Sequence, residues 1–559
     1  MIEKRGLSQL EQDKLNIDPD FDFKDIAAKP FSDLTTNQIG MFKWTGIYHQ
    51  LQPGYFMMRL RIAGGLITAA KLKVVADIAE RYGQGELCIT TRQCLQFHFL
   101  QKDDLHLVID ELAAVGITSK NACGDVVRNV TSCPLQGVCK HEIGDVRSVI
   151  ETIDADKEFL DEQRNLSRKH KINVSGCGAA CGLQLINCQS WVPCEREIKG
   201  IAVRGWQYFA GGGLGRNPYL AQWIFSWVPE KLVTAITSAA VEIHRLHGDR
   251  TTRSLGRLKI IVARFGHQAF ALELIRIMRE RKVADLDELE IAPQATPKIP
   301  PMPFAGESVV PQRQEDLSTV RVMIRRSEIS ATEAIQFATW AEQFGSAEII
   351  FTARQNLQIR NVPDTKVAEL VKLITSAGYR MQGHDYLPDI VACVGTTLCN
   401  LAVSDTPNSY RQVIDAFADD VDFWSDIGPL RIHMNGCPNS CAQHWIADIG
   451  LRGTREMQKN GSEEGFSIFV GGAVEGSGHI AEHVVDVSSK AVVPIMKQLL
   501  DLYLKDRNNG AEHFGVYARR VGVKYLRENL DLDLDVTNVQ QVNQDLTAVF
   551  ANVIKEAKP

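Results

Sequence analysis

Apolar residues recur along the chain with the spacing of short strands and amphipathic helices. In residues 55–62, apolar and basic side chains mix in the manner of a strand. Residues 69–82 predict a helix, residues 87–91 a second strand, and residues 104–115 a second helix. This order predicts a βαβ-like unit in the first half of the chain.

The same order of elements returns in the second half. Residues 320–324 and 347–351 predict strands, and residues 331–344 and 366–377 predict helices. A cysteine-bearing region follows each unit. The chain contains no run of about 18 apolar residues, so we expect no membrane-spanning helix.

Eight of the thirteen cysteines make this repeat explicit. In each half, one pair is six positions apart and another is four apart, and equivalent cysteines are offset by 260 positions. Arg92 and Arg354, each followed by glutamine, match at an offset of 262. The repeated cysteines are Cys133, Cys139, Cys177 and Cys181 in the first half, and Cys393, Cys399, Cys437 and Cys441 in the second.

The two halves meet at a proline-rich stretch, residues 293–312. Proline at this density favours an extended linker. A duplicated strand-and-helix pattern around such a linker predicts an α+β protein with pseudo-twofold symmetry. We expect a site between the halves.

Composition narrows the class of protein. A length of 559 residues predicts three or four domains, and 45% hydrophobic with 23% charged residues is typical of a folded chain. A net charge of −6 argues against nucleic acid as the main partner. Residues 1–7 are charged and lack the apolar core of a secretory signal, so we expect a cytoplasmic protein.

In a reducing compartment the repeated cysteines are better explained as metal ligands than as disulfides. Four thiolates from two short motifs suit one tetrahedral zinc ion or one [4Fe–4S] cube. Zinc sites usually have shorter cysteine pairs than the five-residue interval between Cys393 and Cys399, which favours a cluster. Glycine and small residues around Cys437 and Cys441 allow backbone amides to reach the sulfurs.

Four motifs give the chain a family resemblance. They are Cys393…Cys399, Asn435-Gly436-Cys437-Pro438-Asn439-Ser440-Cys441, Thr90-Thr91-Arg92-Gln93 and Arg128-Asn129-Val130. With them, the chain resembles the siroheme-dependent assimilatory-type sulfite and nitrite reductases over residues 42–530. The resemblance implies an internally duplicated fold in which each half has a ferredoxin-like half-domain and a cysteine-bearing siroheme/[4Fe–4S] domain.

The resemblance also implies domain boundaries. They are residues 1–50 for an N-terminal extension, 51–116 and 117–292 for the two domains of the first half, 293–312 for the linker, and 313–385 and 386–559 for the two domains of the second half.

The implied cofactors are siroheme and a [4Fe–4S] cluster. Cys393, Cys399, Cys437 and Cys441 would hold the cluster, Cys441 would also bridge to the siroheme iron, and Asn439 would lie at the cofactor. Many relatives keep a cluster only in the second half. Here Cys133, Cys139, Cys177 and Cys181 all remain, which leads to the hypothesis of a second [4Fe–4S] cluster, with or without an inactive tetrapyrrole beside it.

An oxyanion reductase needs fixed positive charge to gather its substrate and proton donors to remove oxygen as water. By resemblance, Arg59, Arg128, Lys169 and Lys171 match the substrate-binding cations of the family. Arg61 and Arg92 would bind siroheme carboxylates, although a solvated charge is the simpler interpretation of Arg61 alone. The second-half equivalents of the four substrate cations are Arg321, Pro388, Pro429 and Arg431, so we expect a single active site.

The sequence therefore predicts the six-electron reduction of sulfite. Nitrite reduction by the same machinery is the alternative, because Val127 and residues 42–46 look nitrite-like while residues 128–133 and 399–402 look sulfite-like. A non-catalytic electron-transfer protein or a zinc-stabilised protein is the alternative from another class. No flavin or nicotinamide domain is visible, so the donor would be a ferredoxin or a separate flavoprotein subunit.

Overall fold

Two five-stranded sheets form the middle of the molecule, and each contains one strand from the other half of the chain. The computed structural model describes residues 7–16, 21–156, 160–161, 165–295, 297–458 and 461–532. The first sheet has the order β1 (Ile47–His49), β2 (Tyr55–Arg59), β5 (Leu95–Gln101), β4 (Glu86–Ile89) and β14 (Glu328–Ser330). The second has the order β12 (Val309–Pro311), β13 (Leu317–Val322), β16 (Leu357–Pro363), β15 (Glu348–Phe351) and β3 (Leu66–Thr68).

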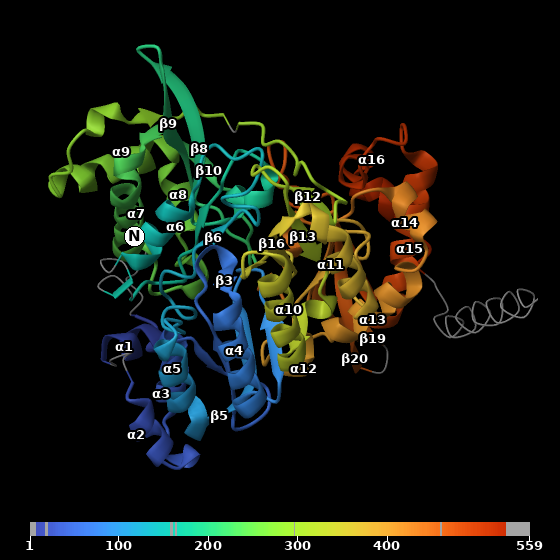
Figure 1. Cartoon of the computed structure of the whole chain (residues 1–559), viewed down its shortest axis with the longest axis horizontal. Coiled ribbons are helices and arrows are strands. Elements are labelled where there is room, and N and C mark those ends of the chain that lie inside the picture. Colours follow the sequence, from blue (N-terminus) through green and yellow to red (C-terminus); the bar gives the residue numbers. More distant parts are fainter. Residues whose placement is uncertain are drawn as a thin grey trace, which may run out of the picture.

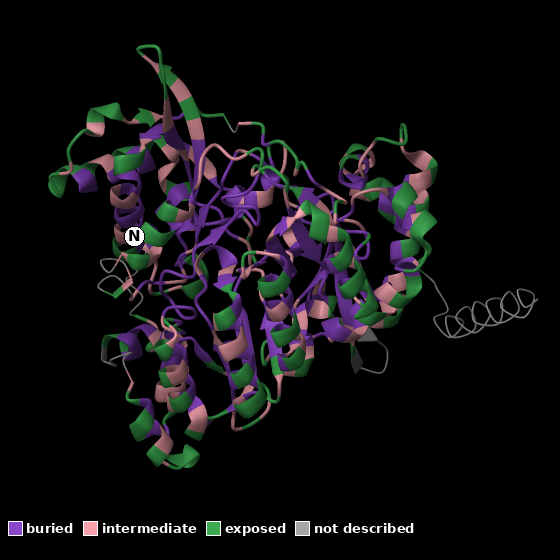
Figure 2. Ribbon diagram, viewed as in Figure 1, coloured by how far each residue is buried: buried purple, intermediate pink, exposed green. Residues whose placement is uncertain are grey.

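The exchanged strands join the two halves into one body. Strand β14 of the second half pairs with β4, and β3 of the first half pairs with β15. The long helices that follow the exchanged strands, α4 (Ala69–Tyr82) and α10 (Ala331–Phe344), pack against each other and lie side by side in Figure 1. Helices α5 (Leu105–Ala114) and α11 (Asp364–Ser376) complete the two units. One hydrophobic core runs through both sheets, with Phe97 and Phe351 among its members (Figure 2).

Two further sheets carry the cysteines. In each, two short strands run parallel to the start of a long third strand, and this long strand pairs antiparallel with the strand that follows it. The first-half sheet has the order β11 (Glu290–Ile291), β10 (Gln222–Pro229), β9 (Ile201–Ala210), β8 (Gln189–Ile198), β7 (Ile172–Val174) and β6 (Thr131–Ser132). The second-half sheet has the order β17 (Val391–Ala392), β18 (Ile432–Asn435), β19 (Ile449–Gln458), β20 (Gly461–Val470) and β21 (Glu482–Ser488).

Helices cover these two sheets and extend the N-terminal end. The first sheet is accompanied by α6 (Arg147–Ala155), α7 (Val233–His247), α8 (Leu258–Phe265) and α9 (His267–Glu280), and the second by α12 (Gly395–Leu398), α13 (Thr406–Phe417), α14 (Val421–Ile427), α15 (Val492–Asp506) and α16 (Phe514–Glu528). The N-terminal helices are α1 (Gln9–Asn16), α2 (Phe23–Ala28) and α3 (Thr36–Met41).

The α+β class and the internal duplication are confirmed. Helices α4 and α10 have the predicted bounds, whereas β5 and β16 were not predicted at all. The domain boundaries stay predictions, and residues 1–6, 17–20 and 533–559 of the predicted first and last segments lie outside the described residues. Within the described part of the chain, no helix is both long and apolar enough to span a membrane.

Two glutamines in matching turns tie the halves together. Gln93 and Gln355 both adopt left-handed backbone angles, with φ of 58° and 64°. The Gln93 amide nitrogen donates to the Phe351 carbonyl at 3.0 Å, and its oxygen accepts from the Ser132 amide at 2.8 Å. Gln355 makes the reciprocal bonds to Ile89 and Ala392. Each turn is therefore held by the opposite half of the chain.

We expect Gln93→Met to destabilise the protein by about 1–3 kcal/mol, because it leaves a buried carbonyl and a buried amide unpaired while keeping the side-chain volume. Urea unfolding followed by circular dichroism would measure the change. The exposed Gln268→Met on α9 is the matched control. Equal midpoints for the two variants would contradict the role given to Gln93.

Candidate active site

The second-half cysteines gather at one edge of their sheet. Cys393 directly follows β17, and Cys437 follows β18 by one residue. Because β17 and β18 are parallel neighbours, their carboxyl ends meet at the same edge. Cys399 and Cys437 each interact electrostatically with Cys441, and so does Cys393. The four sulfurs therefore face a common centre.

Backbone amides point at these sulfurs. Gly436 N–H donates to Cys393 Sγ at 3.1 Å, and Leu401 N–H donates to Cys399 Sγ at 3.4 Å. Asn439 hydrogen-bonds Cys437 through both its backbone and its side chain. Such bonds stabilise the negative charge of thiolates that bind an iron–sulfur cluster. Cys441 is the only cysteine in the chain with an exposed side chain, so its sulfur is free to meet a second group.

A turn of the first half lies against Cys441. Thr91 Oγ1 donates to the Cys441 carbonyl at 2.8 Å. The next residue, Arg92, donates to the Asn187 side chain at 2.6 Å and the Asn129 carbonyl at 2.6 Å. Its buried Nε has no partner in the described part of the chain. A guanidinium anchored in this way, with one donor left over, is prepared for an anion.

Arg59 and Arg128 lie on the same side as this turn. Arg59, at the end of β2, donates from Nε to Gln96 at 2.8 Å and is within electrostatic range of Cys441. Arg128 is buried, and it donates to the carbonyls of Ala122 and Gly124 at 3.2 and 2.9 Å. Those bonds fix the guanidinium in the loop before β6.

Lys169 and Lys171 lie on the segment before β7, next to Arg128, whose amide bonds to the His170 carbonyl at 2.9 Å. Burial, then the nearby Arg257, lowers the pKa of Lys169 to about 7. Burial, followed by Arg92 and Lys169, lowers the pKa of Lys171 well below its usual range. Each lysine is thus poised to bind an anion, which restores its charge, and to exchange a proton.

The short strands β6 and β7 separate the first half's cations from its own cysteines. Arg128 and Lys171 precede these strands, whereas Cys133 and Cys177 follow them. At about 3.3 Å per residue, Arg128 and Cys133 are roughly 15 Å apart along the sheet. The pseudo-twofold arrangement instead brings first-half cations to second-half cysteines, as the Thr91–Cys441 contact records.

Two residues of this site escaped the sequence prediction. Arg257 is buried with a partnerless Nε, and its charge acts on Lys169 and Lys171. Tyr48 accepts a hydrogen bond from the Gly124 amide at 3.4 Å, and burial beside Cys123 raises its pKa. The repeat gave no signal for Arg257, because the equivalent position is His513: each residue caps the start of a helix that reaches a left-handed glycine nine residues later, Gly266 and Gly522. No repeat points to Tyr48.

Arg61, which was predicted to be a siroheme ligand, has partners of its own within the first half. Its buried guanidinium forms an ion pair with Asp154 at 2.6 Å and donates to the Val127 carbonyl at 3.3 Å. A cation with its own carboxylate attracts a cofactor carboxylate weakly. Arg61 thus lies against the segment before Arg128, and its role as a siroheme ligand stays a prediction.

The second-half equivalents of the cations are neutralised. Arg321 pairs with Asp385 at 2.7 Å, Arg354 with Asp389 at 2.8 Å, and Arg431 with Asp448 at 3.1 Å. By contrast, the first-half set forms no ion pair with any carboxylate in the described ranges. This set is Arg59, Arg92, Arg128, Lys169, Lys171 and Arg257. Only one of the two pseudosymmetric positions therefore has positive charge available for anions.

Comparison with known families agrees with this arrangement. The model "Nitrite and sulphite reductase 4Fe-4S domain" matches residues 123–282 and 384–537. The model "Nitrite/Sulfite reductase ferredoxin-like half domain" matches residues 48–115 and 310–377. The chain belongs to the nitrite and sulfite reductase family. Like the rest of this family, it is an oxidoreductase that uses siroheme and a [4Fe–4S] cluster.

Individual relatives cover most of the chain. An assimilatory ferredoxin-dependent nitrite reductase of Haloferax mediterranei is 30% identical, over 78% of this chain and 77% of the relative. A ferredoxin sulfite reductase of Mycolicibacterium paratuberculosis is 29% identical, over 87% and 89%. The solved structure of the NirA protein of Mycobacterium tuberculosis superposes with a TM-score of 0.84 at 27% identity, covering 93% of this chain and 98% of NirA.

Both cofactors of the family fit the residues present. The cluster matches four converging thiols with amide donors at the sulfurs. Siroheme carries many carboxylates, and these match a group of cations that lack carboxylate partners, including two arginines with an orphaned Nε. Exposed Cys441 connects the two groups.

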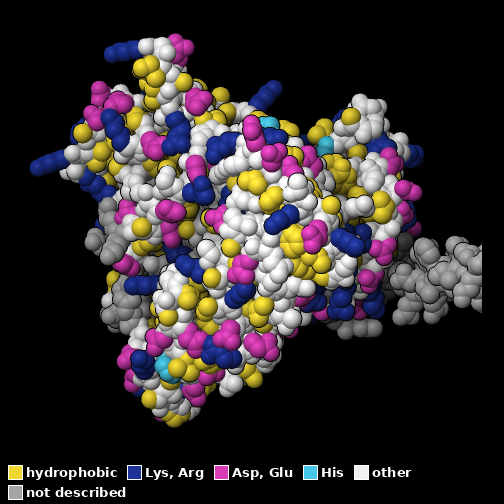
Figure 3. All heavy atoms as spheres, viewed as in Figure 1, with side chains coloured by type: hydrophobic (Ala, Val, Ile, Leu, Met, Phe, Trp, Pro, Cys, Tyr) yellow, Lys and Arg dark blue, Asp and Glu magenta, His cyan; other side chains and the backbone are white. Residues whose placement is uncertain are grey.

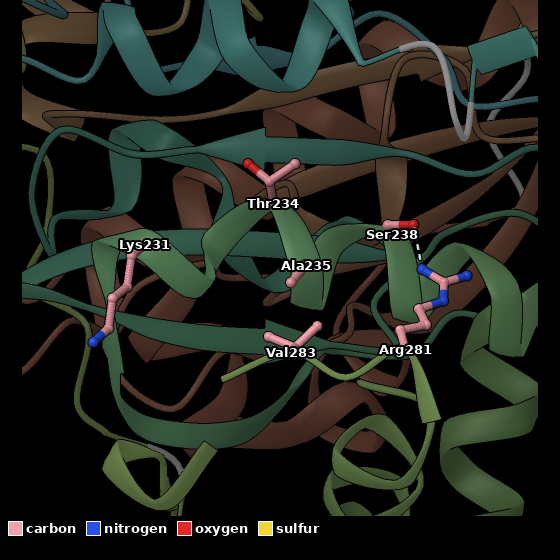
Figure 4. Close-up of a pocket in the computed structure, with 6 residues that line it drawn as sticks. All are labelled: Lys231, Thr234, Ala235, Ser238, Arg281 and Val283. Atoms are coloured by element: carbon pink, nitrogen blue, oxygen red, sulfur yellow. Dashed lines mark hydrogen bonds between the residues drawn. The ribbon is translucent and has the colours of Figure 1, made fainter. Parts of the chain in front are cut away.

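The surface hollow in Figure 4 plays no part in this site. It is lined by Lys231, Thr234, Ala235, Ser238, Arg281 and Val283, beside α7 and the end of α9. Arg281 donates to Ser238 across its floor at 2.8 Å. None of the cations or cysteines of the site lines it.

On the face shown in Figure 3, acidic and basic side chains are interspersed.

Asp125 makes stability near the site depend on pH. It is buried before the Arg128 loop and pairs with Arg253 at 2.8 Å and Lys14 at 3.5 Å. Despite burial, these cations hold its pKa at about 2. A depressed pKa contributes stability that is fully present above pH 4 and is lost as the pH falls towards 2, by about 2 kcal/mol.

We expect Asp125→Asn to lower stability at neutral pH and to flatten the acid limb of the stability curve. Urea unfolding at a series of pH values between 6 and 2 would measure this change. The exposed Asp110→Asn serves as the control. An unchanged acid limb in the Asp125 variant would show that Asp125 does not cause the loss of stability at low pH.

Proposed function

We propose that this reductase catalyses the six-electron reduction of sulfite to sulfide and takes its electrons from a ferredoxin. The observation that supports it is the group of first-half cations without carboxylate partners, which faces the exposed Cys441. A doubly charged oxyanion is attracted to such a group more strongly than a neutral molecule. When bound, the siroheme–cluster pair would supply electrons to the oxyanion one at a time.

The protein's own residues would bind the oxyanion and deliver protons. Arg59 and Arg128 would hold its oxygens, since their guanidinium groups are fixed by Gln96 and by backbone carbonyls. The Nζ atoms of Lys169 and Lys171 would donate protons to oxygens that leave as water. Arg92 and Arg257 would bind siroheme carboxylates, and the four second-half cysteines would hold the cluster.

Nitrite is the second candidate substrate, and one contact favours it. The nitrite-like segment 42–46 packs under the loop that carries Arg128: the Asn121 amide donates to the Trp44 carbonyl at 2.9 Å, and Trp44 packs with Val126. The relative from Haloferax mediterranei is also named as a nitrite reductase. Several curated relatives carry ferredoxin in their names, which supports a ferredoxin over a flavoprotein as the donor.

Steady-state kinetics would test the proposal. The holoenzyme would be assayed with reduced ferredoxin on sulfite and on nitrite, with sulfide and ammonia as the measured products. A higher kcat/KM on sulfite supports the proposal. A higher kcat/KM on nitrite would make nitrite, rather than sulfite, the substrate. If a chemical reductant sustains turnover and ferredoxin does not, the proposed donor is wrong while the reductase assignment stands.

A further inference from the structure

The first-half cysteines converge as closely as those of the catalytic half. Cys133 follows β6 and Cys177 follows β7, again at the common carboxyl edge of two parallel strands. The sulfurs of Cys133 and Cys181 are 3.7 Å apart, and Cys177 hydrogen-bonds Cys181. Cys139 packs in the same buried cluster as Cys133. All four are free thiols, so no disulfide explains their proximity.

The loop between Cys133 and Cys139 is held from several sides. Leu135 N–H donates to Cys133 Sγ at 3.5 Å, and the Gly137 amide donates to the buried Glu142 carboxylate at 2.8 Å. From the other half of the chain, Arg313 N–H donates to the Val138 carbonyl at 2.7 Å. These hydrogen bonds fix the loop and so hold the thiols in place. Packing of a hydrophobic core alone would not require thiols at these positions.

A buried arginine beside this loop is only partly satisfied by the described residues. Arg360 on β16 is fully buried and bonds to the Gln136 carbonyl, within the cysteine loop. Its Nε and Nη1 atoms have no hydrogen-bond partner in the described ranges. The carboxylates of Glu348, Glu142 and Asp145 act on this guanidinium electrostatically but form no ion pair with it. An oxidised [4Fe–4S] cube with four thiolate ligands carries net negative charge and would add to this stabilisation of the buried cation.

The proline-rich linker lies where a second tetrapyrrole would be. In the active half, Arg59 is within electrostatic range of Cys441, and siroheme would be held beside both residues. Its equivalent Arg321 instead donates to the linker carbonyls of Phe304 and Glu307 at 3.2 and 2.6 Å. The Phe304 ring is 5.4 Å from this guanidinium and also packs on Cys133 and Cys139. Phe304 thus fills the space between cation and cysteines.

We propose that Cys133, Cys139, Cys177 and Cys181 bind a second [4Fe–4S] cluster, which has no tetrapyrrole partner because the linker around Phe304 occupies that position. Met302, Phe304 and Val310 cover the cysteines, so this cluster is shielded from water. Among the described residues, no three histidine, cysteine or acidic side chains are arranged for a single metal ion. A cube is several ångströms across and spreads its ligands further than one ion does.

The ratio of non-haem iron to siroheme in the purified holoenzyme tests the proposal without any mutation. We expect about eight non-haem irons and acid-labile sulfides for each siroheme, and one siroheme per chain. About four irons, stoichiometric zinc, or a second tetrapyrrole would each overturn the proposal. Turnover and the siroheme bands are measured on the same sample. A sample that is active but contains only about four non-haem irons would contradict the second cluster without contradicting the reductase function.

A variant locates the additional iron. Cys133→Ser combined with Cys181→Ser is expected to lose about four non-haem irons while keeping the siroheme bands. Cys194→Ser, at a half-buried cysteine of β8 without a repeat partner, is the matched control and should keep all of them. If the double variant keeps the full iron content, the first-half cysteines are not the ligands. If it does not fold, the wild-type ratio decides.

Discussion

A Cys441→Ala enzyme is expected to lose all measurable reduction of sulfite and nitrite. Cys441 is the exposed member of its four-cysteine set, and its carbonyl accepts the Thr91 bond that joins the cluster edge to the cation turn. Removing its sulfur takes away one cluster ligand and the link to siroheme in a single step. Groups that act as one unit lose their joint effect when any one of them is removed.

Visible spectroscopy and iron analysis would check the Cys441 result alongside turnover. The siroheme bands should shift or disappear, and the non-haem iron should fall by about four per chain. Cys194→Ser again provides a cysteine control, since it should keep both cofactors and activity. Full turnover in the Cys441 variant would contradict the whole assignment of the site.

Much of the fold was predictable because the repeat can be recognised from single, chemically distinctive residues such as the cysteines. The cysteine offset of 260 located the cysteine-bearing region of each half, and the bounds of α4 and α10 followed from apolar spacing. Strand β5 was missed because six of its seven residues, including His98, are buried or nearly so, which hides the alternation of a half-exposed strand. The linker was predicted as extended, but its docking on the first-half cysteines through Phe304 was not.

The exchanged strands could not be predicted from local pattern. Strands β3 and β14 have three residues each, and their partners lie in the opposite half of the chain. Short strands gain their stability from the neighbours that they pair with rather than from propensity. The same reasoning applies to Gln93, whose sequence neighbours give no sign that its partner is Phe351.

The single active site was predicted for an incomplete reason. The sequence showed that proline replaces two of the four cations in the second half, at Pro388 and Pro429. The structure adds that the remaining arginines, Arg321 and Arg431, are paired with acidic residues. Pairing of this kind depends on distant segments meeting in space, so a charge count along the chain does not reveal it. The pairing of Arg61 with Asp154 escaped the sequence for the same reason, because the two residues are 93 positions apart.

We expect Lys169→Met to lower kcat by about 10²-fold or more, the usual contribution of a positioned proton donor. In free energy this corresponds to about 3 kcal/mol of transition-state stabilisation. Lys169 lies among Arg128, Arg257 and Lys171 and has a lowered pKa of about 7. It therefore suits proton delivery at neutral pH, a role that the methyl thioether cannot take over. Methionine keeps the length of the side chain, so the siroheme spectrum should remain.

The conservative variant separates charge from proton transfer. Lys169→Arg keeps a cation for the oxyanion but holds its proton too tightly to deliver it, so KM should stay near the wild-type value while kcat remains low. The exposed Lys505→Met on α15 controls for the loss of a positive charge elsewhere. If Lys169→Arg restored kcat, Lys169 would act only through its charge. If Lys169→Met turned over both anions normally, Lys169 would not belong to the site.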